Sequence, residues 1–398
     1  MDPFSNFKTK QTLAVIGAFL CAGAAQAADV QLYGVLDTGF LYTHDRLENQ
    51  GGRFQDEYQG TASAGSLVME SSINYGSRFG LKGSEELAPG VRLGFVLESG
   101  IMTDSGEFKT ANRIFDREAQ LYIESDLGRL AFGRIGPVSG SIGAYHQLTL
   151  RGDALDGGFY WLTRNVYDNM VTYVSPDFAG AKAYLQYSFE TNSSAGLEGN
   201  ADAERYASAA ITLDRGPLQA VVMADTIMRS STADPRLGDA YSVGFGANYK
   251  IADVTPYLGF QLGRNETVWN WVGSSSFLSA NYLAKHNVSG VIGQFDGWST
   301  TVGALFENMP GTPGANIQAA VFYGKADGEI FNAGRTTEKA AFEEDLEKYG
   351  FIAMYIFPLS KKALVYAGGA YTAERMERSG ADIDHDTWQA ATGMAIAF

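Results

Sequence analysis

The stretch TWQAATGMAIAF, residues 387–398, alternates between two kinds of side chain. In an extended strand, successive side chains point to opposite faces. One face would carry Trp388, Ala390, Thr392, Met394, Ile396 and Phe398, and the other Thr387, Gln389, Ala391, Gly393, Ala395 and Ala397. The first face is large and apolar, whereas the second is small or polar. The pattern predicts a β-strand with one face against an apolar medium.

The composition of the whole chain extends this prediction. The 398 residues include 47 Gly but only 10 Pro, and 13% are aromatic, a mixture that favours many strands joined by turns. After residue 27, no segment approaches the roughly 18 to 20 consecutive apolar residues of a transmembrane helix. Two all-β alternatives remain: a soluble secreted protein, or a closed barrel, which satisfies its backbone hydrogen bonds inside lipid.

The first 27 residues have the features of a secretory signal peptide. Lys8 and Lys10 precede an apolar run from Thr12 to Leu20, and Ala25-Gln26-Ala27 is a small-x-small cleavage site. We therefore expect a signal peptide over residues 1–27 and a single domain over residues 28–398.

Cys21 is the only cysteine and lies in the predicted signal peptide, so the mature chain would contain none. Zinc-thiolate sites and cysteine nucleophiles are then excluded. A lipoprotein alternative at Cys21 is disfavoured by the bulky Phe19 and Leu20 before it.

Enzyme and nucleic-acid functions find little support in the sequence. The four histidines, His44, His146, His286 and His385, have no metal-like spacing, and G-x-S-x-G is absent. We expect no cofactor and no metal, although a barrel-type lipase or protease stays as an alternative. The net charge of −15 becomes −16 when Asp2, Lys8 and Lys10 are removed with the signal, which disfavours a nucleic-acid partner.

Short and long connections alternate along the chain. Seven short turns carry Gly, Pro, Asp or Asn: 87–90, 126–128, 176–180, 214–217, 250–253, 308–313 and 358–360. Eight long polar stretches lie between them: 43–65, 101–114, 135–165, 190–203, 228–238, 264–292, 325–345 and 375–385. Fifteen connections predict sixteen antiparallel strands, with every short turn at one end. A soluble β-sandwich would share the alternation but not this asymmetry, which is typical of outer-membrane barrels. The run 342–348 is interpreted as a solvated face or a helical turn within a loop.

Several motifs resemble the general porins of Gram-negative outer membranes, most closely the β-proteobacterial subgroup. They are DVQLYGVLDTGF (29–40), SRFGLKGSEELAPGVRLGFVLESG (77–100), RIFDREAQLYIESDLGRLAFGR (113–134), VTYVSPDFAG (171–180), PLSKKALVYAGGAYT (358–372) and the terminal Phe398. The resemblance spans the mature chain. It implies a 16-stranded antiparallel transmembrane β-barrel in the outer membrane, assembled as a homotrimer among lipid and lipopolysaccharide. It also implies that the long third loop, about 135–165, folds into the lumen, and that small hydrophilic solutes and ions diffuse passively through. Phe398 would be the signal recognised by the barrel-assembly machinery.

Charged side chains at a constriction would control passage through such a pore. Strand parity places Arg78, Lys82 and Arg92 on the inner wall. Arg117 lies at the entry to the fourth strand, Arg134 begins the third loop and Arg164 closes it. In the family, positions matching Arg78, Arg117 and Arg164 line one side of the constriction, and acids on the inward loop face them. The acids that we assign are Asp153 and Asp156 in the loop and Glu118 in the wall.

Each assignment has a structural alternative. Arg78 and Lys82 could pair with Glu98 or Glu118 within the wall, and Asp153 and Asp156 could cap a short helix.

The sequence determines the ion selectivity of the pore less closely than it determines the fold. The subgroup often has Arg where Thr172 stands, which removes one possible lumen charge. An arginine-rich ring favours anions, whereas an acidic exterior gathers cations, so we expect little or mild anion selectivity. Aromatic residues in the third loop leave a solute-specific channel or an adhesin open as alternatives: Tyr145, Phe159, Tyr160 and Trp161.

Overall fold

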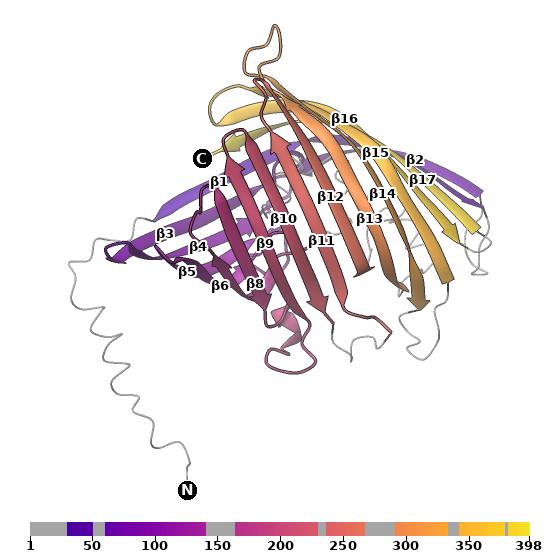
Figure 1. The fold of residues 1–398 in the computed structure, drawn as a ribbon. Coiled ribbons are helices and arrows are strands. Elements are labelled where there is room, and N and C mark those ends of the chain that lie inside the picture. Colours follow the sequence, from indigo (N-terminus) through magenta and orange to yellow (C-terminus); the bar gives the residue numbers. More distant parts are fainter. Residues whose placement is uncertain are drawn as a thin grey trace.

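The strands wrap into a closed antiparallel barrel in the computed structural model (Figure 1). The structure describes residues 30–50, 60–140, 164–229, 236–266, 291–332, 342–378 and 381–398, so the predicted signal peptide lies outside the described residues. The first strand, β1 (Gln31–Gln50), pairs with the last, β17 (Ala381–Ala397), and this pairing closes the sheet. No helix in the described part of the chain is long and apolar enough to cross a membrane.

Fifteen further strand segments complete the wall in chain order. They are β2 (Gly60–Ser71), β3 (Arg78–Ala88), β4 (Val91–Gly100), β5 (Glu118–Ser125), β6 (Gly128–Ile135), β7 (Tyr167–Val174), β8 (Ala181–Ser188), β9 (Arg205–Arg215), β10 (Leu218–Met228), β11 (Ala240–Tyr249), β12 (Val254–Glu266), β13 (Val291–Phe306), β14 (Asn316–Asn332), β15 (Phe342–Pro358) and β16 (Ala363–Arg378).

Two of these segments, β2 and β3, occupy one position in the wall. Both pair antiparallel with β1, β2 through Thr38↔Ser71 and β3 through Val35↔Arg78. Moving three residues along β1, from Thr38 to Val35, therefore corresponds to moving seven residues along its partner, from Ser71 to Arg78. The extra residues leave the ladder and form the break between β2 and β3. Counted by position, the barrel has sixteen strands, and the predicted number is confirmed.

Asp37 holds this break together from inside the wall. Its carboxylate accepts hydrogen bonds from the backbone N–H groups of Ile73 (2.9 Å), Asn74 (3.2 Å) and Tyr75 (3.0 Å). It also accepts one from the hydroxyl of Tyr366 on β16, at 2.7 Å. Because Asp37 is fully buried, these donors replace the water that its carboxylate would otherwise need.

The two faces of the wall differ as the alternation predicts. Val222, Val243 and Phe245 are exposed on the outer face, whereas Asp225 and Ser242 are buried on the inner face. In the last strand, Trp388, Met394, Ile396 and Phe398 are likewise exposed. An apolar exterior around a polar interior is the pattern of a membrane barrel with an aqueous lumen.

A row of aromatic side chains crosses the outer face at a single level. Trp298 lies 6.3 Å from Phe260 and 5.5 Å from Tyr323, and Tyr371 lies 4.4 Å from Trp388, measured between ring centroids. Aromatic girdles of this kind mark the membrane–water interface. From Trp388 to Phe398 the strand contains 11 residues, which agrees with the roughly 9 to 11 residues of a membrane-spanning strand.

The seven predicted short turns are confirmed, but three predicted long loops are wrong in extent. Strands continue through most of 43–65, 325–345 and 375–385, and the run 342–348 belongs to β15. Beyond the aromatic row the outward side chains become charged, so the apolar signal of a strand disappears. The backbone pairing persists there, because oppositely charged neighbours such as Lys325↔Glu347 and Glu347↔Arg375 face each other across strands.

Phe398 joins the closing seam. Its N–H donates to the carbonyl of Gly34 at 3.1 Å, and the N–H of Gly34 donates to the carbonyl of Phe398 at 3.2 Å. A Cβ on Gly34 would lie 2.9 Å from one atom of the Phe398 ring, closer than packed atoms tolerate. The glycine thus allows the terminal ring to lie against β1.

Candidate functional site

Two arginines share one carboxylate on the inner wall: Arg78 begins β3, Arg117 directly precedes β5, and the carboxylate belongs to Glu98 on β4. Arg117 donates from Nε to Oε1 of Glu98 at 2.6 Å, and Nε of Arg78 lies 3.6 Å from Oε2 of Glu98. The hydroxyl of Tyr33 donates to the same Oε2 at 3.0 Å. The predicted alternative that Arg78 pairs with Glu98 is therefore present. Lys82 instead lies 5.0 Å from the ring centroid of Tyr33.

A second pair of arginines shares Asp168, the second residue of β7. Arg113 donates to both carboxylate oxygens of Asp168, at 2.6 and 3.1 Å, and Arg134 donates to Oδ1 at 2.6 Å. The backbone N–H and hydroxyl of Ser193 also donate to Asp168. The hydrogen bonds with Asp168 raise the pKa of Arg113, which keeps its guanidinium charged.

Arg129 on β6 adds a third basic group to this wall. Its guanidinium lies 3.7 Å from the ring centroid of Tyr122 and donates to the side chain of Gln120 at 2.9 Å. Neither of these two partners carries a charge, while Glu118 acts on Arg129 electrostatically and Glu124 is its cross-strand neighbour.

The two shared carboxylates lie deeper than the arginines that bind them. The side chain of Arg78 is 27% exposed against 10% for Glu98, and that of Arg113 is 26% exposed against 7% for Asp168. Solutes in the lumen therefore meet guanidinium groups before carboxylates. In their usual charge states, the five arginines and Lys82 exceed the five acids of this wall, Glu98, Asp116, Glu118, Glu124 and Asp168, by one charge.

Arg164 lies apart from these groups, in a buried cluster with side chains of β10 and β12. Its side chain is 5% exposed and donates to Asp225 on β10 at 2.6 Å and to Glu266 on β12 at 2.7 Å. Burial alone would lower the pKa of Arg164, but the two carboxylates raise it well above its usual value. Ser139, at the other described end of the third loop, also donates to Asp225 at 2.6 Å. The cluster thus fastens both described ends of this loop to the wall.

Of the remaining predicted residues, Arg92 is not brought into these groups, whereas Glu118 lies within reach of the charges of Arg117 and Arg129. Arg92 lies beside a short turn, 55% exposed and 3.8 Å from Glu124. Glu118 accepts a hydrogen bond from Gln120 at 3.2 Å. Asp153, Asp156 and the predicted aromatic track lie outside the described residues. In the segments that the structure describes, no group of three or more His, Cys, Asp or Glu side chains could hold a metal ion.

Sequence reasoning missed several members of the site: Arg113, Arg129, Asp168, Asp225 and Glu266. A signal for Arg129 was available, because Leu130 and Phe132 take the outer face of the same strand and leave Arg129 inside. No local pattern indicates the partners of Arg164, which lie 61 and 102 residues away in the sequence.

A closed barrel with an apolar exterior, aromatic rows and a polar, arginine-bearing interior defines an outer-membrane channel. A family model for Gram-negative porins matches residues 12–377, and the chain belongs to this family. It is an outer-membrane porin that forms a water-filled pore for passive diffusion of small hydrophilic solutes and ions.

Individual relatives and solved structures match between 63% and 94% of this chain. An outer membrane porin protein of Bordetella pertussis is 27% identical over 92% of this chain and 94% of its own length. Outer membrane porin protein 32 of Delftia acidovorans is 26% identical over 63% of this chain and 69% of its own length. The solved anion-selective porin from Comamonas acidovorans has a TM-score of 0.60 at 18% identity, with 94% of this chain and all of that chain covered. OmpF of Salmonella typhi gives 0.58 at 15% identity, with 93% and 97% covered.

Proposed function

We propose that the pore prefers small anions weakly, and that Arg78, Arg113, Arg117, Arg129 and Arg134 produce this preference. The observation that carries the proposal is the arrangement of two arginines around each buried carboxylate. The arginines face the lumen and the acids lie behind them, so the local potential is positive although the excess charge is small. Passage is diffusion, and the proposal assigns the chain no chemical step.

The third loop would complete the constriction. We propose that it folds into the lumen and that Asp153 and Asp156 face the arginine wall, which would create a field across the pore. The attachment of Ser139 and Arg164 to Asp225 supports an inward path for this loop. A transverse field orients dipolar solutes and disfavours apolar ones, which cannot compensate for displacing ordered water.

Reversal potentials test the arginine wall. In planar bilayers with a KCl gradient, the wild-type pore should give a small potential of the sign that indicates chloride preference. Arg78→Ala and Arg117→Ala should each reduce the chloride-to-potassium permeability ratio by roughly twofold, since one charge about 8 Å from an ion in water contributes about 0.5 kcal/mol. Arg92→Ala is the matched control at the short-turn end. Equal effects of Arg92→Ala and Arg78→Ala would contradict the proposed position of the selective charges.

Membership of the porin family supports a homotrimer and assembly in contact with lipopolysaccharide. Native mass spectrometry of the detergent-solubilised protein tests the trimer, and a monomer under mild conditions would contradict it. A channel specific for one sugar remains the second candidate. Saturation of the conductance by one sugar at low concentration would favour it over a general pore.

A further inference from the structure

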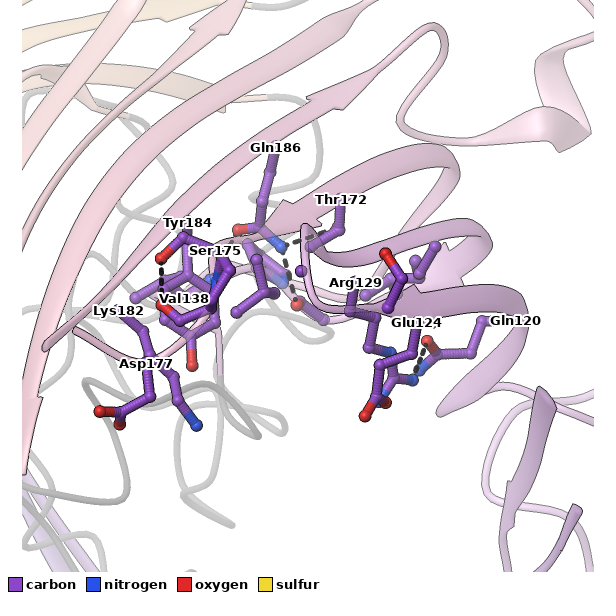
Figure 2. A pocket seen from close by; sticks show the side chains of 18 residues that line it. Gln120, Glu124, Arg129, Val138, Thr172, Ser175, Asp177, Lys182, Tyr184 and Gln186 are labelled. Atoms are coloured by element: carbon purple, nitrogen blue, oxygen red, sulfur yellow. Dashed lines mark hydrogen bonds between the residues drawn. The ribbon is translucent and has the colours of Figure 1, made fainter. Parts of the chain in front are cut away.

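A recess of about 590 Å³ lies in the inner wall at the short-turn end of the barrel (Figure 2). Strands β5 to β8 line it, together with Gly136–Val138, which follow β6. Its volume falls within the roughly 300 to 1,000 Å³ that is typical of small-molecule sites. It lies apart from the residues of the two shared-carboxylate groups, none of which lines it.

The back of the recess is polar and fixed by hydrogen bonds. The side chain of Gln186 accepts from the N–H of Val138 at 2.9 Å and from the hydroxyl of Ser208 at 3.0 Å. Its amide donates to the hydroxyl of Thr172 at 3.2 Å. Because these groups satisfy one another, the surface is formed before any solute arrives.

Arg129 supplies a positive charge on one side of the recess (Figure 2). The stacking on Tyr122 and a hydrogen bond to Gln120 hold the guanidinium in place, and no other described side chain accepts a hydrogen bond from its remaining N–H groups. Glu124 faces Arg129 in the strand register, but the ion pair of Glu124 is with Arg92.

Lys182 supplies a second positive charge from the other side, on β8 (Figure 2). Among the described residues, Lys182 forms no ion pair with a carboxylate. The nearby Asp177 accepts the backbone N–H of Gly180 at 2.8 Å and so completes its own turn. Two cations thus face the recess from opposite sides, and Glu124 and Asp177 also contribute to its lining.

We propose that this recess binds small organic anions that carry carboxylates, with Arg129 and Lys182 as the groups that hold them. A carboxylate satisfies an arginine and a lysine through charge-assisted hydrogen bonds, and Thr172 and Gln186 offer polar contacts between them. The inference deepens the proposed function, on which it rests, because it adds a binding step for one class of solute at the periplasmic end of the same pore.

Saturation-transfer difference NMR on the purified full-length protein in deuterated detergent tests the site without requiring conduction. The ligand is succinate, and succinamide is the uncharged molecule of matched size. We expect a saturable signal for succinate and a much weaker one for succinamide. Equal signals for the two molecules would overturn the proposal.

Single substitutions locate the binding. Arg129→Gln and Lys182→Gln should each weaken succinate binding by about three- to tenfold, as for loss of one charge-assisted hydrogen bond in a wet site. Arg129→Lys should recover part of the loss. Lys250→Gln removes an exposed positive charge at the same end, where Lys250 pairs with Glu307, and should bind like wild type.

The outcomes separate this proposal from the arginine wall. Wild-type succinate affinity in both glutamine variants, with each barrel folded as judged by heat-dependent gel migration, would overturn the recess site. That result would not bear on the reversal potentials of Arg78→Ala and Arg117→Ala, which test the arginine wall without Arg129, the one residue that both proposals share. Conversely, a pore without chloride preference would refute the arginine wall and leave the NMR result standing.

Discussion

Asp168 shows how much one buried carboxylate does in this wall. It joins the loop after β4 through Arg113, strand β6 through Arg134 and the loop after β8 through Ser193. Removal of one partner from a buried ionic group costs more than the intact group contributes, because the remaining charges lose their compensation.

We therefore expect Asp168→Asn to lower the free energy of barrel unfolding by about 3 kcal/mol. The same change should increase chloride preference, because two guanidinium groups lose their shared negative charge. Urea unfolding of the refolded protein measures the first effect and reversal potentials measure the second. Asp214→Asn, exposed near the end of β9, is the control. Unchanged stability would mean that the ion pairs of Asp168 contribute nothing net.

Single residues also show what the sequence can predict about the site. The inward direction of Arg78 followed from the outward Phe79 and Leu81, and Arg129 could have been assigned in the same way. Arg164 could not, because its burial depends on Asp225 and Glu266, which the barrel brings to it from distant strands. The alternation of side chains along a strand predicts on which side of the wall a charged side chain lies. It does not predict which partner neutralises that charge.

Among the elements, the broken strand β2–β3 is the least regular part of the wall. The hydroxyl of Tyr366 reaches Asp37 across β17, above Gly393, where a Cβ would lie 2.6 Å from the ring carbon that bears the hydroxyl. This contact links β16 to β1 independently of the backbone ladder.

Tyr366→Phe removes this link while it keeps the ring. We expect the free energy of unfolding to fall by about 1.5 to 3 kcal/mol, the usual range for a hydrogen bond to a charged group. Tyr241→Phe, on the exposed outer face, should change it little, and urea titrations of both variants provide the comparison. A loss of equal size in Tyr241→Phe would argue against a specific role for the Asp37 contact.

The long strands show where the prediction of strand ends from the sequence fails. Turns were predicted correctly because Gly, Pro, Asp and Asn specify them locally. The ends of β14 to β17 were not, because charged residues occupy both faces there. On the inner face, Lys348 pairs with the buried Glu374 at 3.1 Å, and Glu374 contacts His385 at 2.9 Å. Such pairs stabilise a strand that has no apolar alternation to reveal it.

The last strand permits a prediction about assembly. Phe398 pairs with Gly34 at the seam. We propose that this terminal aromatic residue is also recognised by the barrel-assembly machinery. Deletion of Phe398 should therefore reduce the amount of folded barrel in the outer membrane much more than the conductance of each assembled pore. Phe398→Tyr should assemble nearly normally. A deletion variant that reaches the membrane at wild-type level would refute the assembly role.

At the scale of the whole molecule, two charged regions have opposite effects on anions: the arginine wall inside the pore attracts them, and the acidic residues outside it repel them. The chain carries a net charge of −15, and part of the excess acid lies on the strands that continue beyond the aromatic row. Asp345 and Glu377, for example, face each other as exposed neighbours on β15 and β16. The arginine wall acts inside the pore over short distances, whereas the outer acids act on ions that are still approaching.

Changing the salt concentration should distinguish the effects of the two regions on selectivity. The Debye length is about 30 Å at 0.01 M and about 3 Å at 1 M, so the outer acids repel approaching chloride mainly at low ionic strength. Charges inside the pore are screened less. We therefore expect chloride preference to rise as KCl increases from about 0.03 to 0.3 M, a range that takes the Debye length from well above 10 Å to below it. Reversal potentials at a fixed concentration ratio measure this trend, and the double variant Asp345→Asn with Glu377→Gln should flatten it. If chloride preference instead falls steadily with salt in the wild type, the outer acids do not influence entry, and the arginine wall alone sets the selectivity.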